Sequence, residues 1–149
     1  MAFVPEIWEG FGVEWDAIRT QFRSPFKVIR DEPNMFAVQV PMKAEGSDIS
    51  QDLGMAIHEA RNRKLLTLLA PICTAQRLDP ATILQYQDRL PFGAIVIRGE
   101  SVLLRHDVLT ETLSPTVLSW IAAVVAFEAA KLRVNLRVPE TNTFSHYTE

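Results

Sequence analysis

Two stretches of the chain have the pattern of β-hairpins, whose short connections can join only antiparallel strands. Residues 26–31 (FKVIRD) and 35–42 (MFAVQVPM) are rich in β-branched and aromatic residues, and the segment Glu32-Pro33-Asn34 between them is typical of a turn. Residues 90–109 (LPFGAIVIRGESVLLRHDVL) repeat this arrangement around four turn residues, RGES. The pattern favours an antiparallel sheet over a sheet built from strand-helix-strand crossovers.

Helix signals occur in three places. Near the N-terminus, apolar residues recur at spacings of three and four, which predicts an amphipathic helix over residues 13–22. A second helix is expected within residues 78–90, with Asp79 as its N-cap and a proline directly after it. A long helix is expected over residues 115–133, with Ser114 as its N-cap.

The middle of the chain is less clear. Residues 43–52 are polar and predict a loop, whereas residues 53–70 fit either a hairpin or a helix followed by a strand. We favour the strands. The prediction is one α+β domain over residues 1–149, a twisted antiparallel sheet flanked by helices in the order α-β-β-β-α-β-β-α, with residues 134–149 as a loosely ordered tail.

Composition narrows the classes of partner and the compartment. The formal net charge is −3 over 149 residues, which argues against nucleic-acid binding, because phosphate contacts need a surplus of Lys and Arg on one face. A single cysteine rules out an intrachain disulfide. The N-terminus has no basic and apolar leader pattern, and no uncharged run is long enough to span a bilayer. We therefore expect a soluble, cytoplasmic protein.

The sequence contains no recognisable catalytic or metal-binding motif. A phosphate loop and a dinucleotide glycine fingerprint are absent, and His58, His106 and His146 lie far from one another in the sequence. The neighbouring His106 and Asp107 would point to opposite faces of a strand. Apolar surroundings would keep Cys73 an unreactive thiol. We predict no catalytic, cofactor-binding or metal-binding residues, and we keep an enzyme that uses Cys73 or His106 as a minor alternative.

The last helix is apolar over most of its circumference, which requires burial on more than one side. Its cover is either the N-terminal helix, which carries two tryptophans, or another polypeptide chain. We predict Trp8, Trp120 and Phe127 as protein-interface residues, because large aromatic side chains dominate interface energies. Two neighbouring stripes carry its apolar residues: Val117, Leu118, Ile121, Val124, Val125 and Leu132 on one, and Trp120, Ala123, Phe127 and Ala130 on the other.

Residues 26–133 resemble in outline the type III secretion chaperone-like superfamily, in particular its YbjN-like branch, and the similarity is densest over residues 69–133. The resemblance rests on a strand that leads into a helix, an entering strand LPFGAIVI, its partner VLLRHDVL and a long closing helix. Members of that branch often have an Asn before the LPFG sequence, where this chain has Gln87, Asp88 and Arg89. The resemblance implies an α+β fold, a homodimer and, for true secretion chaperones, apolar patches that hold an unfolded polypeptide.

These observations lead to one main hypothesis and one alternative. The main hypothesis is a non-enzymatic, cytoplasmic bacterial protein that dimerises and binds a polypeptide through strand edges and apolar pockets. Nucleic acid, a membrane and a cofactor are not expected as partners. The alternative is a regulatory module that binds a small molecule in an apolar pocket between the sheet and its helices.

Overall fold

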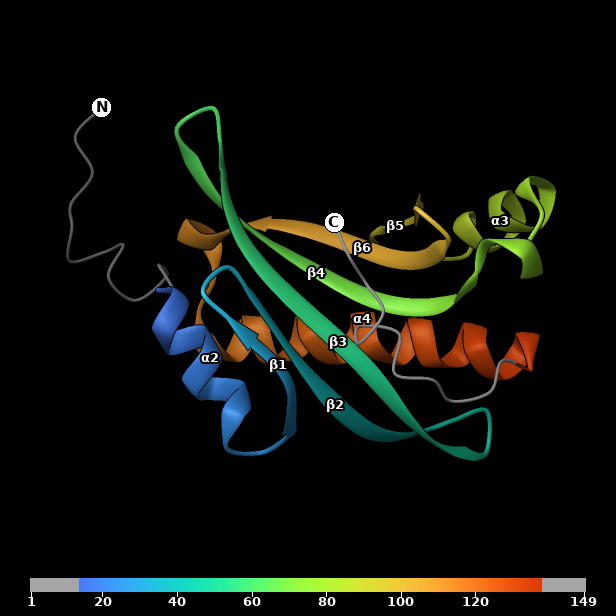
Figure 1. Cartoon of the computed structure of the whole chain (residues 1–149), viewed down its shortest axis with the longest axis horizontal. Coiled ribbons are helices and arrows are strands. Elements are labelled where there is room, and N and C mark those ends of the chain that lie inside the picture. The colour runs from blue at the N-terminus through green and yellow to red at the C-terminus, as the bar shows by residue number, and fades with distance from the viewer. Residues whose placement is uncertain (1–13, 138–149) are drawn as a thin grey trace.

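The computed structural model describes residues 14–137. Six strands form one open sheet in the order β1-β2-β3-β4-β6-β5, and every neighbouring pair is antiparallel (Figure 1). The α+β antiparallel fold that the sequence predicts is therefore confirmed. The elements are α2 (Trp15–Arg23), β1 (Lys27–Glu32), β2 (Met35–Ala44), β3 (Ser47–Ala60), β4 (Arg63–Thr74), η1 (Ala75–Arg77), α3 (Pro80–Gln87), β5 (Ala94–Arg98), β6 (Ser101–Leu109), η2 (Thr110–Thr112) and α4 (Pro115–Leu136).

The sheet has four strands between α2 and α3, one more than the predicted order. Residues 53–70 belong to the hairpin of β3 and β4, so the favoured interpretation of that stretch is confirmed. The prediction of a polar loop over residues 43–52 is wrong, because only Glu45 and Gly46 form a turn there. Both of these residues have positive φ. The remaining residues extend β2 and β3. Their polarity is compatible with a sheet because Gln51 is completely buried and donates from Nε2 to the carbonyl of Pro71 at 2.9 Å.

The helix boundaries follow local capping chemistry. Asp79 accepts a hydrogen bond from the Thr82 N–H at 2.9 Å, and Ser114 accepts one from the Val117 N–H at 3.2 Å, as expected for N-caps. Helix α3 ends earlier than predicted, and α4 continues to Leu136, so three residues of the predicted tail are helical. Arg137 forms the C-cap of α4, and residues 138–149 of the predicted tail lie outside the described residues.

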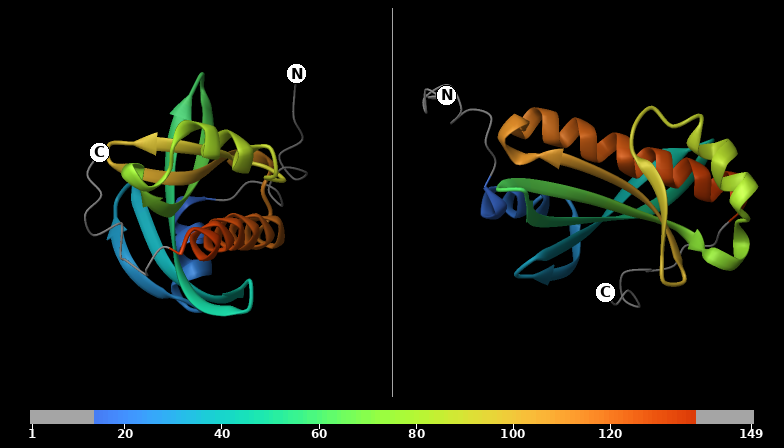
Figure 2. Two further views of the ribbon diagram at one scale, coloured as in Figure 1. Left: turned by 90° about the vertical axis from the view of Figure 1, so that its right-hand side faces the viewer. Right: turned by 90° about the horizontal axis from the view of Figure 1, so that it is seen from above.

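The main core lies between the sheet and α4, which packs against β2, β3, β4 and β6. Figure 2 shows α4 running along one face of the sheet, and α2 and α3 contribute side chains to the same core. None of the helices in residues 14–137 has the length and hydropathy that a bilayer span requires. The large side chains that are completely or almost completely buried in this core include Ile18, Phe36, Leu53, Met55, Leu66, Leu68, Leu104, Leu113 and Leu118.

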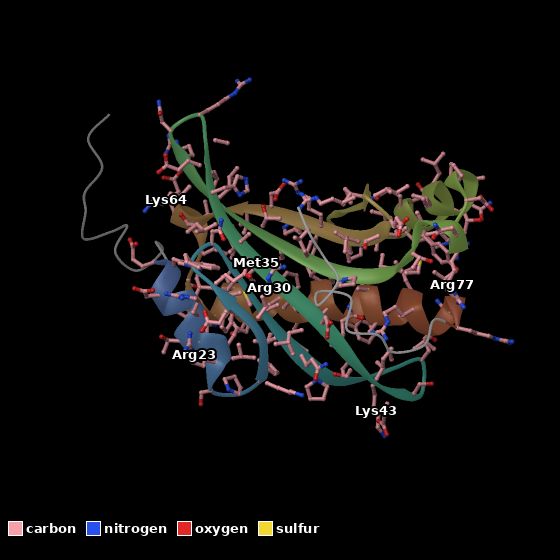
Figure 3. All side chains as sticks on the ribbon, in the orientation of Figure 1. Arg23, Arg30, Met35, Lys43, Lys64 and Arg77 are labelled. Carbon is pink, nitrogen blue, oxygen red and sulfur yellow. The ribbon has the colours of Figure 1, made fainter. Side chains whose placement is uncertain are left out.

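The opposite face of the sheet carries a second, smaller cluster of buried residues. Its members are Met35, Ala37, Leu69 and Leu103, which alternate along their strands with residues of the main core. Figure 3 views the molecule from this side, with Met35 and Arg30 labelled and α4 behind the strands. Both faces of the central strands are therefore buried.

Candidate interaction surface

The solvent-facing side of α4 carries a row of large apolar side chains. Trp120 is 61% exposed, Val117 43% and Phe127 39%, and Val124 between them is half-buried. These four residues are spaced three, four and three apart, so they follow one line along the helix. We call this line, continued through Lys131 and Val134, the α4 seam. A monomer rarely leaves such a contiguous apolar patch exposed unless it is an interaction site.

The α4 seam lies opposite the face that packs on the sheet. Both of these faces are apolar, in agreement with the prediction that this helix has nearly all-round apolar character. The sheet-facing side is covered by the described residues, whereas on the seam side Trp120 contacts Phe92, Val134 packs against the cluster of Ala44, Ile49 and Ala130, and the residues between them stay exposed or partly exposed. The buried residues of α4 are Leu118, Ile121, Ala122, Val125, Ala126, Ala129, Ala130, Leu132 and Arg133.

The N-terminal helix does not cover the seam within the described residues. Gln21 of α2 donates to the carbonyl of Pro115 at 2.7 Å and to Ser119 Oγ at 2.6 Å, which places α2 beside the first turn of α4. Trp15 donates from its indole to the carbonyl of Pro33 at 2.8 Å, on the turn between β1 and β2. Trp8, the third predicted interface residue, lies outside the described residues.

An aromatic stack joins the seam to the sheet. The ring of Phe92, which precedes β5, lies 5.9 Å from Trp120 and 4.5 Å from His106 between ring centroids. Partial burial lowers the pKa of His106, and the charge of Asp107 opposes this only in part. The neutral imidazole of His106 packs against the ring of Phe92, and Phe92 in turn packs against Trp120.

His106 and Asp107 point to opposite faces of β6, as expected for neighbours in a strand. Asp107 accepts hydrogen bonds from Thr67 Oγ1 at 2.5 Å and from Arg105 Nε at 3.1 Å, and His58 Nδ1 lies 3.4 Å from the same Thr67 oxygen. Partial burial alone would raise the pKa of Asp107, but these hydrogen bonds and the Arg105 charge lower it. The carboxylate therefore stays ionised and does not suit the role of a general acid near neutral pH.

Two further features argue against a reactive centre in this polar cluster and at the cysteine. Thr67 is only 4% exposed, so its hydroxyl has little access to a substrate. Burial raises the pKa of Cys73, and the charge of Arg77 only partly opposes this, so the thiolate that a nucleophile needs is disfavoured. Within residues 14–137, no group of three His, Cys, Asp or Glu side chains is arranged to hold a metal ion.

The outer edge of β5 is partly blocked by a side chain. Gln87 donates from Nε2 to the carbonyl of Gly93 at 3.0 Å and accepts from the N–H of Ile95 at 2.6 Å. Its amide thus occupies backbone groups that a neighbouring strand would otherwise bind, a known way to protect a sheet edge. The sequence marked Gln87 only as a departure from a family pattern, because a long-range pairing of this kind has no local signal.

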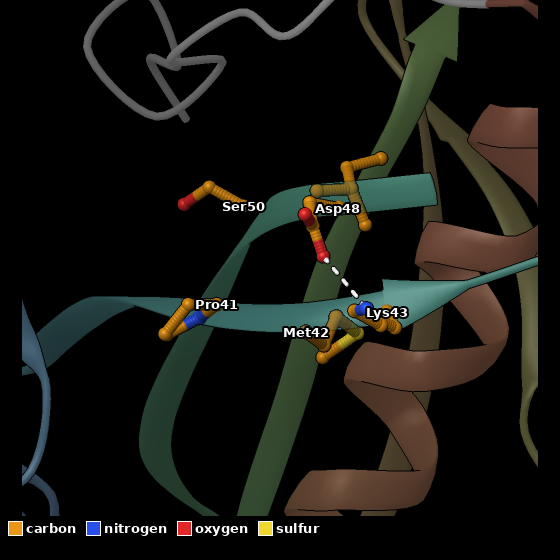
Figure 4. Close-up of a pocket in the computed structure, with 6 residues that line it drawn as sticks. Pro41, Met42, Lys43, Asp48 and Ser50 are labelled. Atoms are coloured by element: carbon orange, nitrogen blue, oxygen red, sulfur yellow. Dashed lines mark ion pairs between the residues drawn. The ribbon is translucent and has the colours of Figure 1, made fainter. Parts of the chain in front are cut away.

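The hollow at the end of the β2 and β3 hairpin has no built-in binding group. Figure 4 shows Pro41, Met42 and Ser50 around an ion pair between Lys43 Nζ and Asp48 Oδ1 at 3.9 Å. Both charged side chains are exposed, and exposed ion pairs contribute little energy. We therefore place the candidate site on α4 and not in this hollow.

Comparison with known proteins identifies no relative of this chain. The chain matches no family model, and it matches no curated protein and no solved structure. The α+β antiparallel fold is consistent with a chaperone-like fold, and any functional conclusion therefore depends on the surface itself.

Proposed function

We propose that this protein is a non-enzymatic protein-binding module, resembling a type III secretion chaperone or YbjN-like protein, that dimerises and binds a polypeptide partner. The observation that carries the proposal is the α4 seam, where Trp120 and Phe127 stand exposed on a rigid helix. Aromatic side chains on rigid elements make large contacts at low entropic cost and are enriched among the residues that dominate interface energies.

The sheet edge offers a place for an extended polypeptide. Among the described strands, β1 and β5 have a neighbour on one side only, and Gln87 occupies just the first part of the β5 edge. Ile97 on β5 is 55% exposed and Ala94 at its start is also exposed, so apolar side chains flank this edge. Strand addition would supply main-chain hydrogen bonds, and these side chains would select apolar residues of the peptide.

The small-molecule alternative finds less support. The apolar cavity between α2, α4 and the sheet has a volume of about 100 Å³ and is lined by Phe22, Phe26, Val40, Leu53 and Ala122 among others. Pockets for drug-sized ligands typically have about 300–1,000 Å³. The hollow of about 320 Å³ on the opposite face is large enough, but it lies outside the space between the sheet and its helices, and its lining mixes apolar side chains such as Met35 and Leu69 with two arginines, a histidine and a threonine.

The proposal is tested by light scattering and by fluorescence of a dye that binds apolar surface. We expect a dimer that binds dye, and we expect Trp120→Lys and Phe127→Glu to give folded protein with a smaller mass. Leu84→Asp is the matched control, because it places a charge on an equally exposed apolar position away from α4. A wild-type monomer that binds no dye would refute the proposal, and a folded Phe127→Glu dimer of unchanged affinity would remove the seam from it.

A further inference from the structure

We infer that the partner of the α4 seam is a second copy of this chain, whose own α4 packs against it in antiparallel orientation with Trp120 next to Lys131 of the partner subunit. The inference rests on the proposed function, and it adds the identity, direction and register of the partner helix. It follows from the spacing of the seam residues, from the one charged residue among them and from the dipoles of the two helices.

The seam has the repeat of a coiled coil. Residues 117, 120, 124, 127, 131 and 134 are spaced alternately three and four apart, which is the a and d pattern of a heptad repeat over about 26 Å of helix. The described residues leave its first four positions fully or partly exposed. Lys131 and Val134 are partly exposed, and Val134 also packs against the small cluster of Ala44, Ile49 and Ala130, so the seam is open mainly from Val117 to Lys131. A helix with this seam fits another helix better than it fits a flat surface.

The single charge in the seam distinguishes the two possible directions. In a parallel pair, Lys131 would meet Lys131 of the partner subunit inside an apolar contact, which is unfavourable for like charges. In the antiparallel pair, position 117 meets 134, 120 meets 131 and 124 meets 127. Each Lys131 then lies over the face of a tryptophan, the aromatic ring that attracts cations most strongly.

Neighbouring residues and the helix ends favour the same arrangement. Ala123 lies beside the seam and is exposed, so a second helix can approach closely there. Antiparallel packing also brings the positive N-terminal end of one helix dipole next to the negative C-terminal end of the other. The ion pair between Lys131 Nζ and Glu128 Oε2 at 3.7 Å keeps the lysine on the seam side of α4.

Charge substitutions at position 120 test the register. In the antiparallel pair, Trp120→Glu places a carboxylate against Lys131 of the partner subunit, whereas Trp120→Lys places two ammonium groups together. At low salt, we expect the Trp120→Lys dimer to have a Kd about tenfold larger than that of the Trp120→Glu dimer. The double variant Trp120→Lys with Lys131→Glu restores the attraction and is expected to recover the affinity of Trp120→Glu.

Cysteine cross-linking gives an independent measure of direction. Val117→Cys and Val134→Cys are prepared as separate variants, with the wild-type chain, whose Cys73 is buried, as the background control. Oxidation of the mixture is expected to give a disulfide-linked dimer, and oxidation of either variant alone is expected to give little. A parallel pair would produce the reverse result.

The outcomes separate this inference from the proposed function. A dimer weakened equally by Trp120→Glu and Trp120→Lys, or cross-linked in each cysteine variant alone, overturns the antiparallel register and leaves the protein-binding module standing. A wild-type monomer that binds the apolar dye overturns self-association through α4 while the seam remains open to another polypeptide. A monomer that binds no dye overturns both.

Discussion

Along α4, the face toward the sheet and the face toward solvent are both apolar, yet Leu118 is completely buried and the adjacent Val117 is 43% exposed. The difference comes from the sheet, which covers one half of the helix and leaves the other to solvent. Residues on the covered face stabilise the monomer, and residues on the open face are available for association. Apolar character therefore marks two different roles on one helix, and substitutions at neighbouring positions can separate them.

The largest difference is expected between Leu118→Ala and Val117→Ala. Leu118→Ala removes buried methyl groups and leaves a cavity, so it is expected to lower the free energy of unfolding by about 2–5 kcal/mol. Val117→Ala is expected to change the stability of the monomer by less than about 0.5 kcal/mol. Urea unfolding at a concentration where the protein is monomeric measures both. Equal losses for the two variants would show that the open face is also core.

A second pair compares the positive charges near the end of α4. Arg133 is buried and donates to the carbonyl of Ser50 at 2.9 Å and to Gln51 Oε1 at 3.1 Å. Arg133→Met leaves these buried acceptors without that donor and is expected to cost about 1–3 kcal/mol of monomer stability. Lys131→Met on the open face is expected to leave monomer stability nearly unchanged and to weaken self-association, because it removes the cation that faces Trp120 of the partner subunit. Thermal unfolding and analytical ultracentrifugation distinguish the two effects.

The smallest expected effect is on the pH dependence of stability, and it comes from His106 in its stack with Phe92 and Trp120. Burial lowers the pKa of His106 below its ordinary value, so the folded state takes up a proton less readily than the unfolded chain. Its contribution to stability is complete above the ordinary histidine pKa of about 6.5 and is lost as the pH falls through the lowered value. His106→Phe keeps a ring against Phe92 and is expected to flatten the pH dependence of the unfolding midpoint in this range. An unchanged slope in the variant would assign the dependence to other groups.

Much of the secondary structure has local causes and could be predicted. The caps at Asp79 and Ser114, the turn at Glu32-Pro33-Asn34 and the RGES turn between β5 and β6 act over a few residues, and the structure contains them as expected. The strand through residues 47–52 could not be predicted from its polar side chains. Gln51 is accommodated there by partners on β4 and α4, which are distant in sequence.

The antiparallel α+β fold and the nearly all-round apolar character of the last helix could both be predicted from the sequence alone. Local turn chemistry and helical periodicity are enough for both conclusions. Only the tertiary structure decided that Trp120 and Phe127 lie on the open side of α4 and that Gln87 blocks part of the β5 edge. Burial and edge pairing depend on which distant elements meet, and no local pattern of residues specifies that.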